Sequence, residues 1–499
     1  MTGDNDHTTR CTIVPPHILE RLALSGDAEL AAAAREALID LDARRLHRRA
    51  QATPESDRPR RPRLAAGSLE GGPVRLISDA QGGTRLPGTS VRGEGDPDTG
   101  DVAVTEAYDG LGDTWALYAE AFERNSLDAR GLPLRASVHY GRDYDNAFWD
   151  GTQMVFGDGD GKIFGRFTAS LDVIGHELAH GVTEHTAGLM YQGQPGALNE
   201  SMSDVFGSLV KQRKLGHSAD AADWLIGAEL LIGELAGQAL RSMIAPGTAY
   251  DNPLLGKDPQ PGHMDDFVDT DEDHGGVHIN SGIPNRAFAL LATSLGGNAW
   301  EVPGRIWYAV LTGPGISADC DFVTFAGLTV DAAITTYGVD SPEALAVRSA
   351  WAQVGVLGPV DEGEDGSEPA GGEAGGSEPG PVADDDTPDP QPVPSRAVVQ
   401  VRRSGGLAGL SKTRSISLED LPAGQEQQWR SVLGGGTLQA IEARVKDGPS
   451  RAVPDGYCYG VICDLPPTDV EIPEQQLPDH LRELFEDTLA DDGGPGKSS

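Results

Sequence analysis

The sequence predicts an α+β fold in two lobes, followed by a second, smaller α+β domain. Short strand-like segments at 73–78 and 135–140 come first, and longer helical patterns dominate after residue 170. Strands followed by helices, rather than alternating with them, indicate a β-rich lobe packed against a helical one. Beyond an acidic, Gly- and Pro-rich stretch, residues 396–488 return to alternating and helical patterns, which predicts the additional domain.

The composition limits the classes of partner. A chain of 499 residues is long enough for two or three domains. Its 77 acidic and 39 basic residues give a formal charge of −38. Nucleic acids and anionic membranes attract basic surfaces, so we expect neither as a partner. No apolar run approaches the roughly 20 residues that cross a bilayer.

The first residues, MTGDNDHTTRC, contain no basic segment followed by an apolar core, so no signal peptide is visible. We therefore expect a cytoplasmic protein, or one exported by an unconventional route. The four cysteines, Cys11, Cys320, Cys458 and Cys463, lie too far apart for a four-thiolate zinc site. Cys458 and Cys463 could pair, but their spacing does not indicate a disulfide framework.

The N-terminal part divides into a segment that can fold and a linker. Residues 1–50 combine an extended stretch, CTIVPPHILERLA, with an alanine- and leucine-rich run that predicts a helix. Residues 51–67 are basic and Pro-rich, which is typical of an exposed linker open to proteolytic processing. Residues 68–358 form the main globular region and end in a helical pattern, SPEALAVRSAWAQVGV.

The C-terminal part begins with a second linker. Residues 359–395 combine Gly, Pro, Ser and acidic residues with no basic one, a composition that cannot bury enough apolar surface to fold. In residues 396–488, AVVQVRR alternates as a strand does, and two later segments, LPAGQEQQWRSVLGG and PDHLRELFEDTL, predict helices. Residues 489–499 are predicted to be a disordered tail.

The segment VIGHELAHGVTEHTAG, residues 173–188, carries candidate metal ligands. His176 and His180 are four residues apart, so on an α-helix both imidazoles leave one face, about 6 Å apart along the axis. They can take two corners of a tetrahedral zinc site. Glu177 lies beside them, placed to act on a metal-bound water without being a ligand. The pattern alone also occurs in helices with incidental histidines.

Two acidic residues on the next predicted helix, GALNESMSDVFGSLV, help to distinguish a metal site from a helix with incidental histidines. Glu200 lies twenty residues after His180 and is a candidate third ligand. Asp204 lies one turn further on the same face, where it can accept the second N–H of a ligand histidine and so select its tautomer.

With these residues in place, HELAHGVTEHTAGLMYQGQPGALNESMSD and DEDHGGVHINSGIPNRAF resemble the thermolysin family of zinc endopeptidases. The resemblance extends over residues 72–357, and PPHILE, DVFGSLVKQ and ADWLIG are most similar to its protealysin-like members. It implies a β-rich N-terminal lobe, a mainly helical C-terminal lobe and a zinc cleft between them. It also implies a neutral endopeptidase made as a precursor, with residues 1–50 as the prosegment.

The resemblance implies zinc as cofactor, held by His176, His180 and Glu200 with water in the fourth position. Zinc lowers the pKa of such a water towards about 7. Glu177 is then implied to take its proton and to pass it to the leaving amine. A minor alternative is that the Cys11 thiolate ligates the metal in the precursor, and otherwise Cys11 is an ordinary, partly buried thiol.

Further positions match residues that stabilise the reaction or bind the substrate. Tyr191 and His278 match the donors to the oxyanion, with Asp273 orienting His278; without the flanking matches they would be taken for a core aromatic and a surface histidine. Asn146 and Ala147 match the edge strand that pairs with a substrate backbone. Arg241 is implied to bind the substrate carbonyl on the leaving side. An apolar pocket for the residue after the cut is implied at Phe164, Val173 and Leu240, and for these three residues core packing is the rival interpretation.

The family's double calcium site is not matched. Asp172 and Asp223 match two of its five carboxylates, but the other three positions hold Lys211, Leu225 and Ala228. A lysine and two apolar residues cannot satisfy a cation that needs six to eight oxygen ligands, so the double site is expected to be lost and calcium binding stays uncertain. We hypothesise that the Lys211 ammonium replaces calcium as the counter-charge.

The C-terminal domain resembles emfourin, a small protein inhibitor of protealysin-like enzymes, through VQVRRSGGLAGLSKTRSISLEDLP and VEIPEQQLPDHLRELF. A flexible linker of about 36 residues reaches about 33 Å, which allows inhibition in cis. The loop around Gly405, Gly406 and Gly409, or a nearby strand, would then enter the cleft. Alternatively, the domain binds a substrate or another partner. We expect a monomer acting on peptides or proteins.

Overall fold

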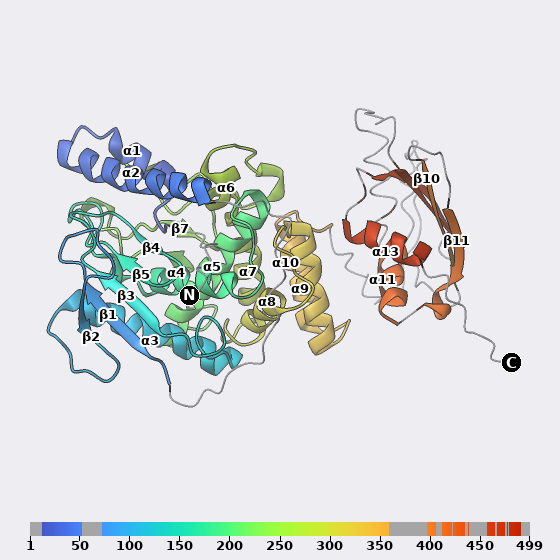
Figure 1. Cartoon of the computed structure of the whole chain (residues 1–499), viewed down its shortest axis with the longest axis horizontal. Coiled ribbons are helices and arrows are strands. Elements are labelled where there is room, and N and C mark those ends of the chain that lie inside the picture. The colour runs from blue at the N-terminus through green and yellow to red at the C-terminus, as the bar shows by residue number, and fades with distance from the viewer. Residues whose placement is uncertain are drawn as a thin grey trace, which may run out of the picture. The chain divides into compact units, whose positions relative to one another are not determined.

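The computed structural model describes most of the chain, and Figure 1 shows the two compact units into which it divides, residues 1–366 and 367–499. The predicted linkers 51–67 and 359–395 and the tail 489–499 lie almost entirely outside the described residues and stay predictions. The described residues are 12–51, 72–358, 397–405, 412–421, 423–434, 438, 457–464, 467–474, 477 and 479–490.

A five-stranded sheet forms the β-rich lobe of the first unit, with the strand order β2-β1-β3-β5-β4. Its strands are β1 (Arg75–Asp79), β2 (Thr89–Arg92), β3 (Leu134–Val138), β4 (Ala147–Trp149) and β5 (Met154–Phe156). Strands β1, β3 and β5 are parallel, whereas β2 and β4 pair antiparallel with their neighbours. Strand β4 is therefore an edge strand, and the backbone groups on its outer side, which no other strand of the sheet uses, can pair with another segment.

One long helix of this lobe, α3 (Val102–Phe122), was not among the predicted elements. Asp101 caps its N-terminus by accepting hydrogen bonds from the backbone N–H groups of Ala103 and Val104. The helix buries an apolar face that includes Leu111 and Leu117, and it packs against β1, β3 and α4. It thereby supplies the layer between the sheet and the helical lobe.

Two helices at the centre of the unit cross unusually closely: α4 (Leu171–Glu184) and α5 (Gly193–Leu215). A Cβ atom on Gly207 would lie 2.3 Å from the carbonyl oxygen of Asp172, and one on Gly175 would lie 2.9 Å from the Cα of Gly207. Only residues without a Cβ permit this approach. The crossing therefore sets the spacing between the polar side chains that the two helices carry.

The rest of the first unit is mainly helical, as the patterns after residue 170 predict. Trp307 and Trp351 stack at its core with ring centroids 5.9 Å apart. The helices are α6 (Asp273–Asn280), α7 (Gly282–Leu295), α8 (Val302–Thr312), α9 (Phe322–Tyr337) and α10 (Pro342–Gln353). Short ribbons pair β6 (Leu225–Ile226) with β7 (Arg241–Ser242) and β8 (Asp251–Asn252) with β9 (Gly256–Lys257). The described residues of this unit also include the 3₁₀ turns η2 (Phe167–Ala169), η3 (Gly233–Leu235) and η4 (Met264–Asp266).

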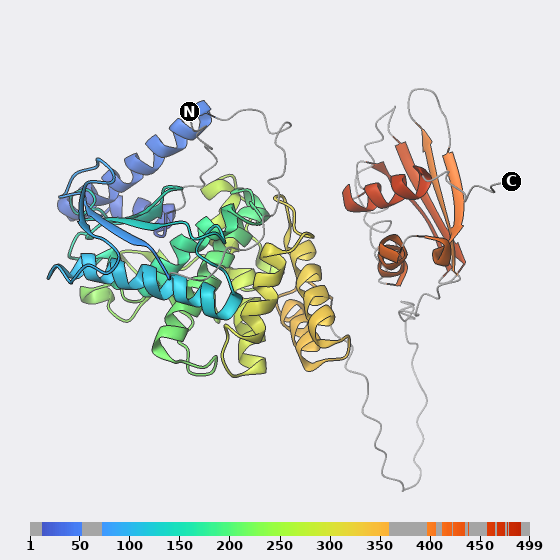
Figure 2. The same ribbon diagram turned by 60° about the horizontal axis from the view of Figure 1, so that its bottom comes forward.

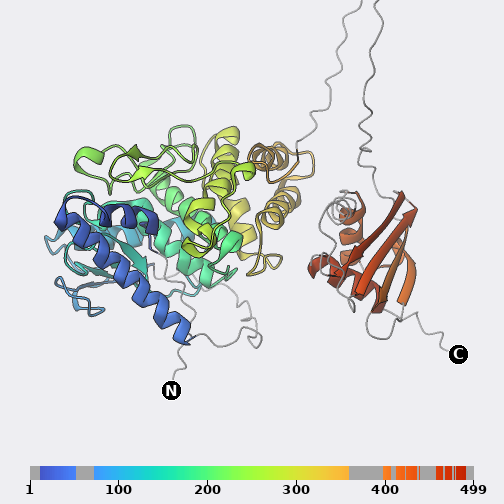
Figure 3. The same cartoon turned by 90° about the horizontal axis from the view of Figure 1, so that it is seen from above.

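The N-terminal segment forms a pair of helices, α1 (Pro16–Ala23) and α2 (Ala28–Gln51), on the outside of this unit (Figure 3). Helix α1 begins with Pro16, whose fixed φ suits the first turn. Its apolar residues, among them Leu19 and Leu22, are fully buried and join the core of the unit. Exposed ion pairs of 2.8 Å also join Lys162 to Asp27 and Glu29. The segment is thus docked by apolar burial.

The second unit is a four-stranded antiparallel sheet with helices on one face (Figure 2). The stacked rings of Trp429 and Phe485, with centroids 5.2 Å apart, lie in its core. Its strands, in the order β11-β10-β12-β13, are β10 (Val398–Gly405), β11 (Lys412–Ser417), β12 (Tyr457–Asp464) and β13 (Pro467–Pro473). Its helices are α11 (Ala423–Gly434) and α13 (Asp479–Ala490), with the 3₁₀ turn η5 (Leu418–Asp420).

The α+β prediction for both units is therefore confirmed. Cys458 and Cys463 both lie on β12, whereas Cys11 lies outside the described residues. Gly405 ends β10, and the predicted contact loop at 406–411 is not described. In the part of the chain that the structure describes, no helix combines the length and apolar character needed to cross a membrane.

Lys211 lies at the α4–α5 crossing, where it contacts three carboxylates. Its Nζ is 3.1 Å from Asp172 and 3.0 Å from Asp223, the two predicted partners. A third carboxylate, that of Glu229 at 3.2 Å, was not predicted. Burial raises the pKa of Asp172, whose side chain is fully enclosed, so the ammonium offsets a charge that water cannot reach. These ion pairs support the counter-charge hypothesis.

Replacing this buried lysine tests the hypothesis. Lys211→Met keeps the volume but leaves Asp172 without its counter-charge, and we expect a loss of about 3–5 kcal/mol in unfolding free energy near pH 8. The loss should be smaller at pH 5 than at pH 8, because burial raises the pKa of Asp172 and protonation of this group at lower pH removes the uncompensated charge. Thermal unfolding followed by circular dichroism measures both, with Lys211→Arg as the charge-retaining control. Equal melting temperatures for Lys211→Met and the wild type at pH 8 would contradict the hypothesis.

Candidate metal centre

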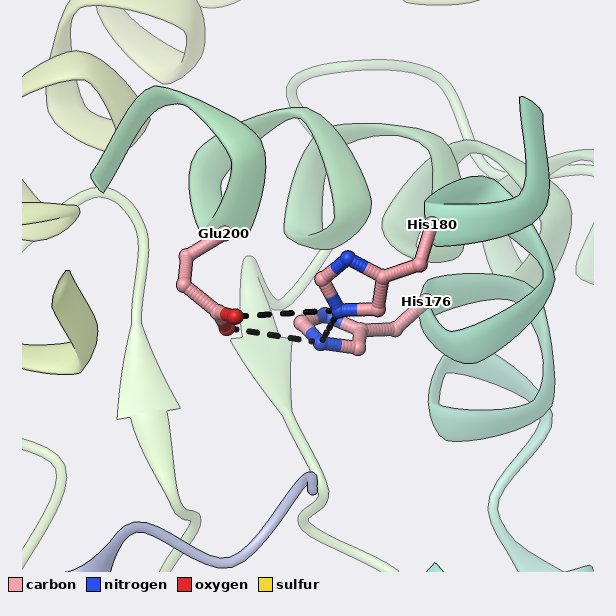
Figure 4. A group of neighbouring side chains, drawn as sticks. All are labelled: His176, His180 and Glu200. Carbon is pink, nitrogen blue, oxygen red and sulfur yellow. Dashed lines mark hydrogen bonds and ion pairs between the residues drawn. The ribbon is translucent and has the colours of Figure 1, made fainter. Parts of the chain in front are cut away.

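Three buried side chains from α4 and α5 converge on one point (Figure 4). His176 and His180 project from α4 with their Nε2 atoms 3.1 Å apart. Glu200 projects from α5, with Oε2 3.5 Å from the Nε2 of His176 and Oε1 3.7 Å from the Nε2 of His180. The structure therefore brings together the three ligands predicted from the sequence.

The partners of the other ring nitrogens determine where the protons lie. The Nδ1 of His176 is 2.8 Å from Asp204 Oδ1, and the Nδ1 of His180 is 2.8 Å from Asn199 Oδ1. The amide of Asn199 is oriented by its own donation to the carbonyl of Leu189 at 3.1 Å. Because both partners are acceptors, each Nδ1 carries the hydrogen. Both Nε2 atoms then present lone pairs to each other and to the carboxylate.

This donor set fits a zinc ion. Two lone pairs that face each other at hydrogen-bonding distance repel, and a cation between them converts the repulsion into coordination. Two imidazole nitrogens and one carboxylate oxygen suit Zn²⁺ and leave a fourth position free. Burial lowers the pKa of His180 to about 4. Although burial opposes it, the positive charge of His278 is the largest influence that lowers the pKa of Glu200, which falls to about 2, so both groups are deprotonated near neutral pH, as ligands must be.

Glu177 lies next to the ligands and is fully buried. Its Oε2 accepts a hydrogen bond of 2.9 Å from the backbone N–H of Trp149, and its Oε1 has no hydrogen-bond partner among the described residues. Burial, followed by repulsion from Glu200, raises its pKa well above the usual range. A carboxylate in this environment can take up a proton near neutral pH, as a general base must.

Tyr191 and His278 face the same point from the other side. Tyr191 donates a hydrogen bond to Glu200, and its hydroxyl lies 3.2 Å from His278 Nε2. Asp273 contacts His278 twice, at Nδ1 (2.7 Å) and at the backbone N–H (2.8 Å). Although burial lowers the pKa of His278, the charges of Asp273 and Glu200 raise it to about 9, so its ring is a cationic donor.

A backbone turn after Asp273 brings its carboxylate into contact with the ring and the backbone N–H of His278. Asp273, His274, Gly275 and Gly276 all have positive φ, from 49° to 81°. Two of the four are not glycine, so this conformation is strained and depends on the contacts around it.

The edge strand β4 is already paired with the N-terminal segment. Thr12 bridges to β4 in antiparallel fashion, and the N–H of Ile13 donates to the carbonyl of Ala147 at 3.3 Å. The N–H of Val14 donates to Asn146 Oδ1 at 3.1 Å. The two residues predicted to bind a substrate backbone thus bind residues 13 and 14 of the same chain.

Arg241 links this segment to the metal ligands. Its Nη1 donates to the carbonyl of Ile13 at 3.2 Å, and its Nε and Nη2 each donate to Asp204 at 2.8 Å. Asn285 adds a further hydrogen bond of 2.8 Å to Asp204. Although burial opposes it, Arg241 and His176 lower the pKa of Asp204, so this carboxylate stays charged. One buried carboxylate therefore orients both a predicted ligand and a predicted substrate-binding residue.

The residues predicted to form an apolar pocket are fully buried in the hydrophobic core that contains Ile13: Phe164, Val173 and Leu240. Several contributors were missed from the sequence, namely Asn199, Asn285 and residues 13–14. For Asn199 the available signal was its place next to Glu200 in a polar stretch of α5, where Ser203, one turn further on, also lies 3.1 Å from the Nδ1 of His180. Nothing in the local sequence connects Ile13 to Ala147.

Comparison with known proteins agrees with this geometry. Residues 81–184 match the family model of the thermolysin metallopeptidase catalytic domain, residues 187–356 match that of its alpha-helical domain, and residues 401–489 match that of emfourin. The extracellular metalloprotease of Pectobacterium carotovorum subsp. carotovorum is 51% identical over 346 residues, which span 69% of this chain and 96% of the relative. Protease PrtS of Photorhabdus sp. (strain Az29) is 56% identical over 284 residues, which span 56% of this chain and 76% of the relative.

A solved structure shares the fold of the first unit. The precursor of protealysin, a metalloproteinase from Serratia proteamaculans, is 53% identical, and the match covers 70% of this chain and all of that one with a TM-score of 0.62. These matches extend through both lobes, and the emfourin match covers the second unit separately. The chain therefore belongs to the thermolysin family of metallopeptidases and carries an emfourin domain at its C-terminal end.

Proposed function

We propose that this metallopeptidase is a zinc endopeptidase that cuts before bulky hydrophobic residues. We further propose that it is made as a precursor and restrained by its prosegment and by its emfourin domain. The observation that carries the proposal is the segment at residues 12–14, which lies along β4 and is held by Asn146, Ala147 and Arg241. Main-chain pairing of this kind is how an edge strand binds an extended peptide without reading its sequence.

His176, His180 and Glu200 would hold the zinc ion, which when bound supplies Lewis-acid chemistry that acidifies water and polarises a carbonyl. The side chains around it carry the other steps. Glu177 takes a proton from the attacking water and passes it to the leaving nitrogen. Tyr191 and His278 donate to the oxygen on which negative charge develops, and each such donor is typically worth about 3–4 kcal/mol of barrier.

The preference for a hydrophobic residue after the cut is supported by Ile13. Arg241 binds its carbonyl, which is the contact proposed for the residue on the leaving side, and Ala147 of the edge strand accepts a hydrogen bond from its N–H. Its side chain is fully buried in the core that holds Phe164, Val173 and Leu240. A charged side chain at this place would lose its hydration without gaining a partner, which costs several kcal/mol.

Restraint by the prosegment follows from occupancy, because a substrate and residues 12–14 need the same hydrogen-bonding groups. Restraint by the emfourin domain rests on its match to an inhibitor-like family and on the linker's reach. The alternative is that this domain binds a substrate or partner and leaves the cleft free.

Replacing the proposed base tests the chemistry. With the prosegment removed, Glu177→Ala should lower kcat by roughly 10²–10⁴-fold on a quenched peptide with Leu after the cut, since general-base catalysis contributes about that much. Zinc measured by elemental analysis should stay near one ion per chain in this variant, whereas His176→Ala should lose it. A matched peptide with Asp in place of Leu should be a poor substrate of the wild type. Undiminished hydrolysis by Glu177→Ala would contradict the role of the base.

Removal of the C-terminal domain tests restraint in cis. A chain that ends at residue 358 should hydrolyse the same peptide faster than the full chain, after both have lost the prosegment. The difference should not depend on protein concentration, because a tethered domain inhibits its own chain. Equal rates would favour the partner-binding alternative.

A further inference from the structure

His17 attaches the prosegment to the catalytic unit in an unusual way. It lies in α1, and its Nε2 is 2.8 Å from the hydroxyl of Tyr250. Its Nδ1 is buried and has no hydrogen-bond partner among the described residues. A neutral imidazole leaves only one weakly polar atom unsatisfied here, whereas an imidazolium would bury an N–H that has no acceptor.

The charged groups around His17 make a positive charge on its own ring unfavourable. Arg241 of β7 and His278 of α6 are both positive and act on the ring, while Asp273 of α6 acts in the opposite sense. Both oxygens of Asp273 are already engaged by His278, at 2.7 and 2.8 Å. Tyr250 is neutral, because burial and the neighbouring Asp258 raise its pKa.

On α1 itself the charged neighbours Glu20 and Arg21 are exposed to water. Burial is therefore the largest influence, and it lowers the pKa of His17 to about 4 from the 6.5 of a solvated histidine. His17 accordingly favours the docked prosegment only while it is neutral. That contribution is complete above pH 6.5 and is lost as the pH falls from 6.5 towards 4.

We propose that His17 is a proton-sensitive latch, whose protonation releases α1 and residues 12–14 from the cleft. The proposal rests on the proposed restraint of the enzyme by its prosegment, and it names the condition that lifts this restraint. His17 binds a proton more readily when the prosegment is undocked, with a pKa of 6.5, than when it is docked, with a pKa of about 4. The equilibrium constant for undocking therefore increases by about 20-fold between pH 7 and pH 5. Mild acidification would thus supply a trigger without any other protein.

Hydrogen exchange tests the latch without relying on catalysis. The full-length, zinc-loaded chain carries Glu177→Ala, so that it does not process itself. The protection factor of the Val14 amide, which is hydrogen-bonded to Asn146 in the docked state, is measured from pH 7 to pH 5. With His17 present, we expect it to fall by about 20-fold. With His17→Gln, which can still hydrogen-bond Tyr250 but does not titrate in this range, it should change little.

The change in the Val14 protection factor between pH 7 and pH 5, called here the pH step, decides the result, and the absolute protection factor does not. His17→Phe repeats the comparison without a polar ring, in case His17→Gln already loosens the segment at pH 7. Tyr250→Phe removes the hydrogen bond but keeps the titrating ring, so the step should persist. If His17→Gln and His17→Phe both show the same pH-dependent fall in protection as the chain that retains His17, the proposal is overturned.

The latch and the proposed function fail in different ways. A step that depends on His17, together with no peptide hydrolysis by the processed wild type, would refute the endopeptidase and leave the latch standing. Hydrolysis by the processed wild type, together with the same step in the His17 variants, would refute only the latch.

Discussion

The site depends on two unprotonated imidazole nitrogens that face each other 3.1 Å apart, with a carboxylate beside them. Such an arrangement is unfavourable without a cation, so the surrounding protein must hold it in place. The close crossing of α4 and α5 at Gly175 and Gly207 supplies the rigidity, because any Cβ at these positions would force the helices apart. The acceptors at each Nδ1 supply the tautomers.

Asp204 extends this constraint from the metal centre to the cleft. It accepts from His176 and from Arg241, and Arg241 in turn binds the carbonyl of Ile13. A fully buried carboxylate is costly unless it is paired, and here the pairing uses a predicted ligand and a predicted substrate-binding residue together. A change at Arg241 would therefore disturb the orientation of His176 as well as peptide binding, and double-mutant cycles are needed to separate the two effects.

The sequence was informative where local spacing carries chemistry. The i, i+4 histidines and the acidic residues one turn apart on α5 are set by helix geometry, so their placement could be expected from the motif. The partners that depend on the fold could not. Asn199 orients His180 only because α5 crosses α4, and Glu229 reaches Lys211 from a loop beyond α5. Helix α3 was missed because the strand patterns on either side of it dominated that region.

An emfourin domain that enters the cleft, as proposed, would compete with the prosegment for the same hydrogen-bonding groups. Asn146, Ala147 and Arg241 are engaged by residues 13 and 14, and an edge strand offers each backbone group once. An emfourin domain that acts on the cleft can therefore bind there only after the prosegment has left. A flexible tether would keep that domain at a local concentration on the order of mM, so release of the prosegment alone would exchange one occupant for another. Full activity then requires two events, and acidification of His17 could supply only the first.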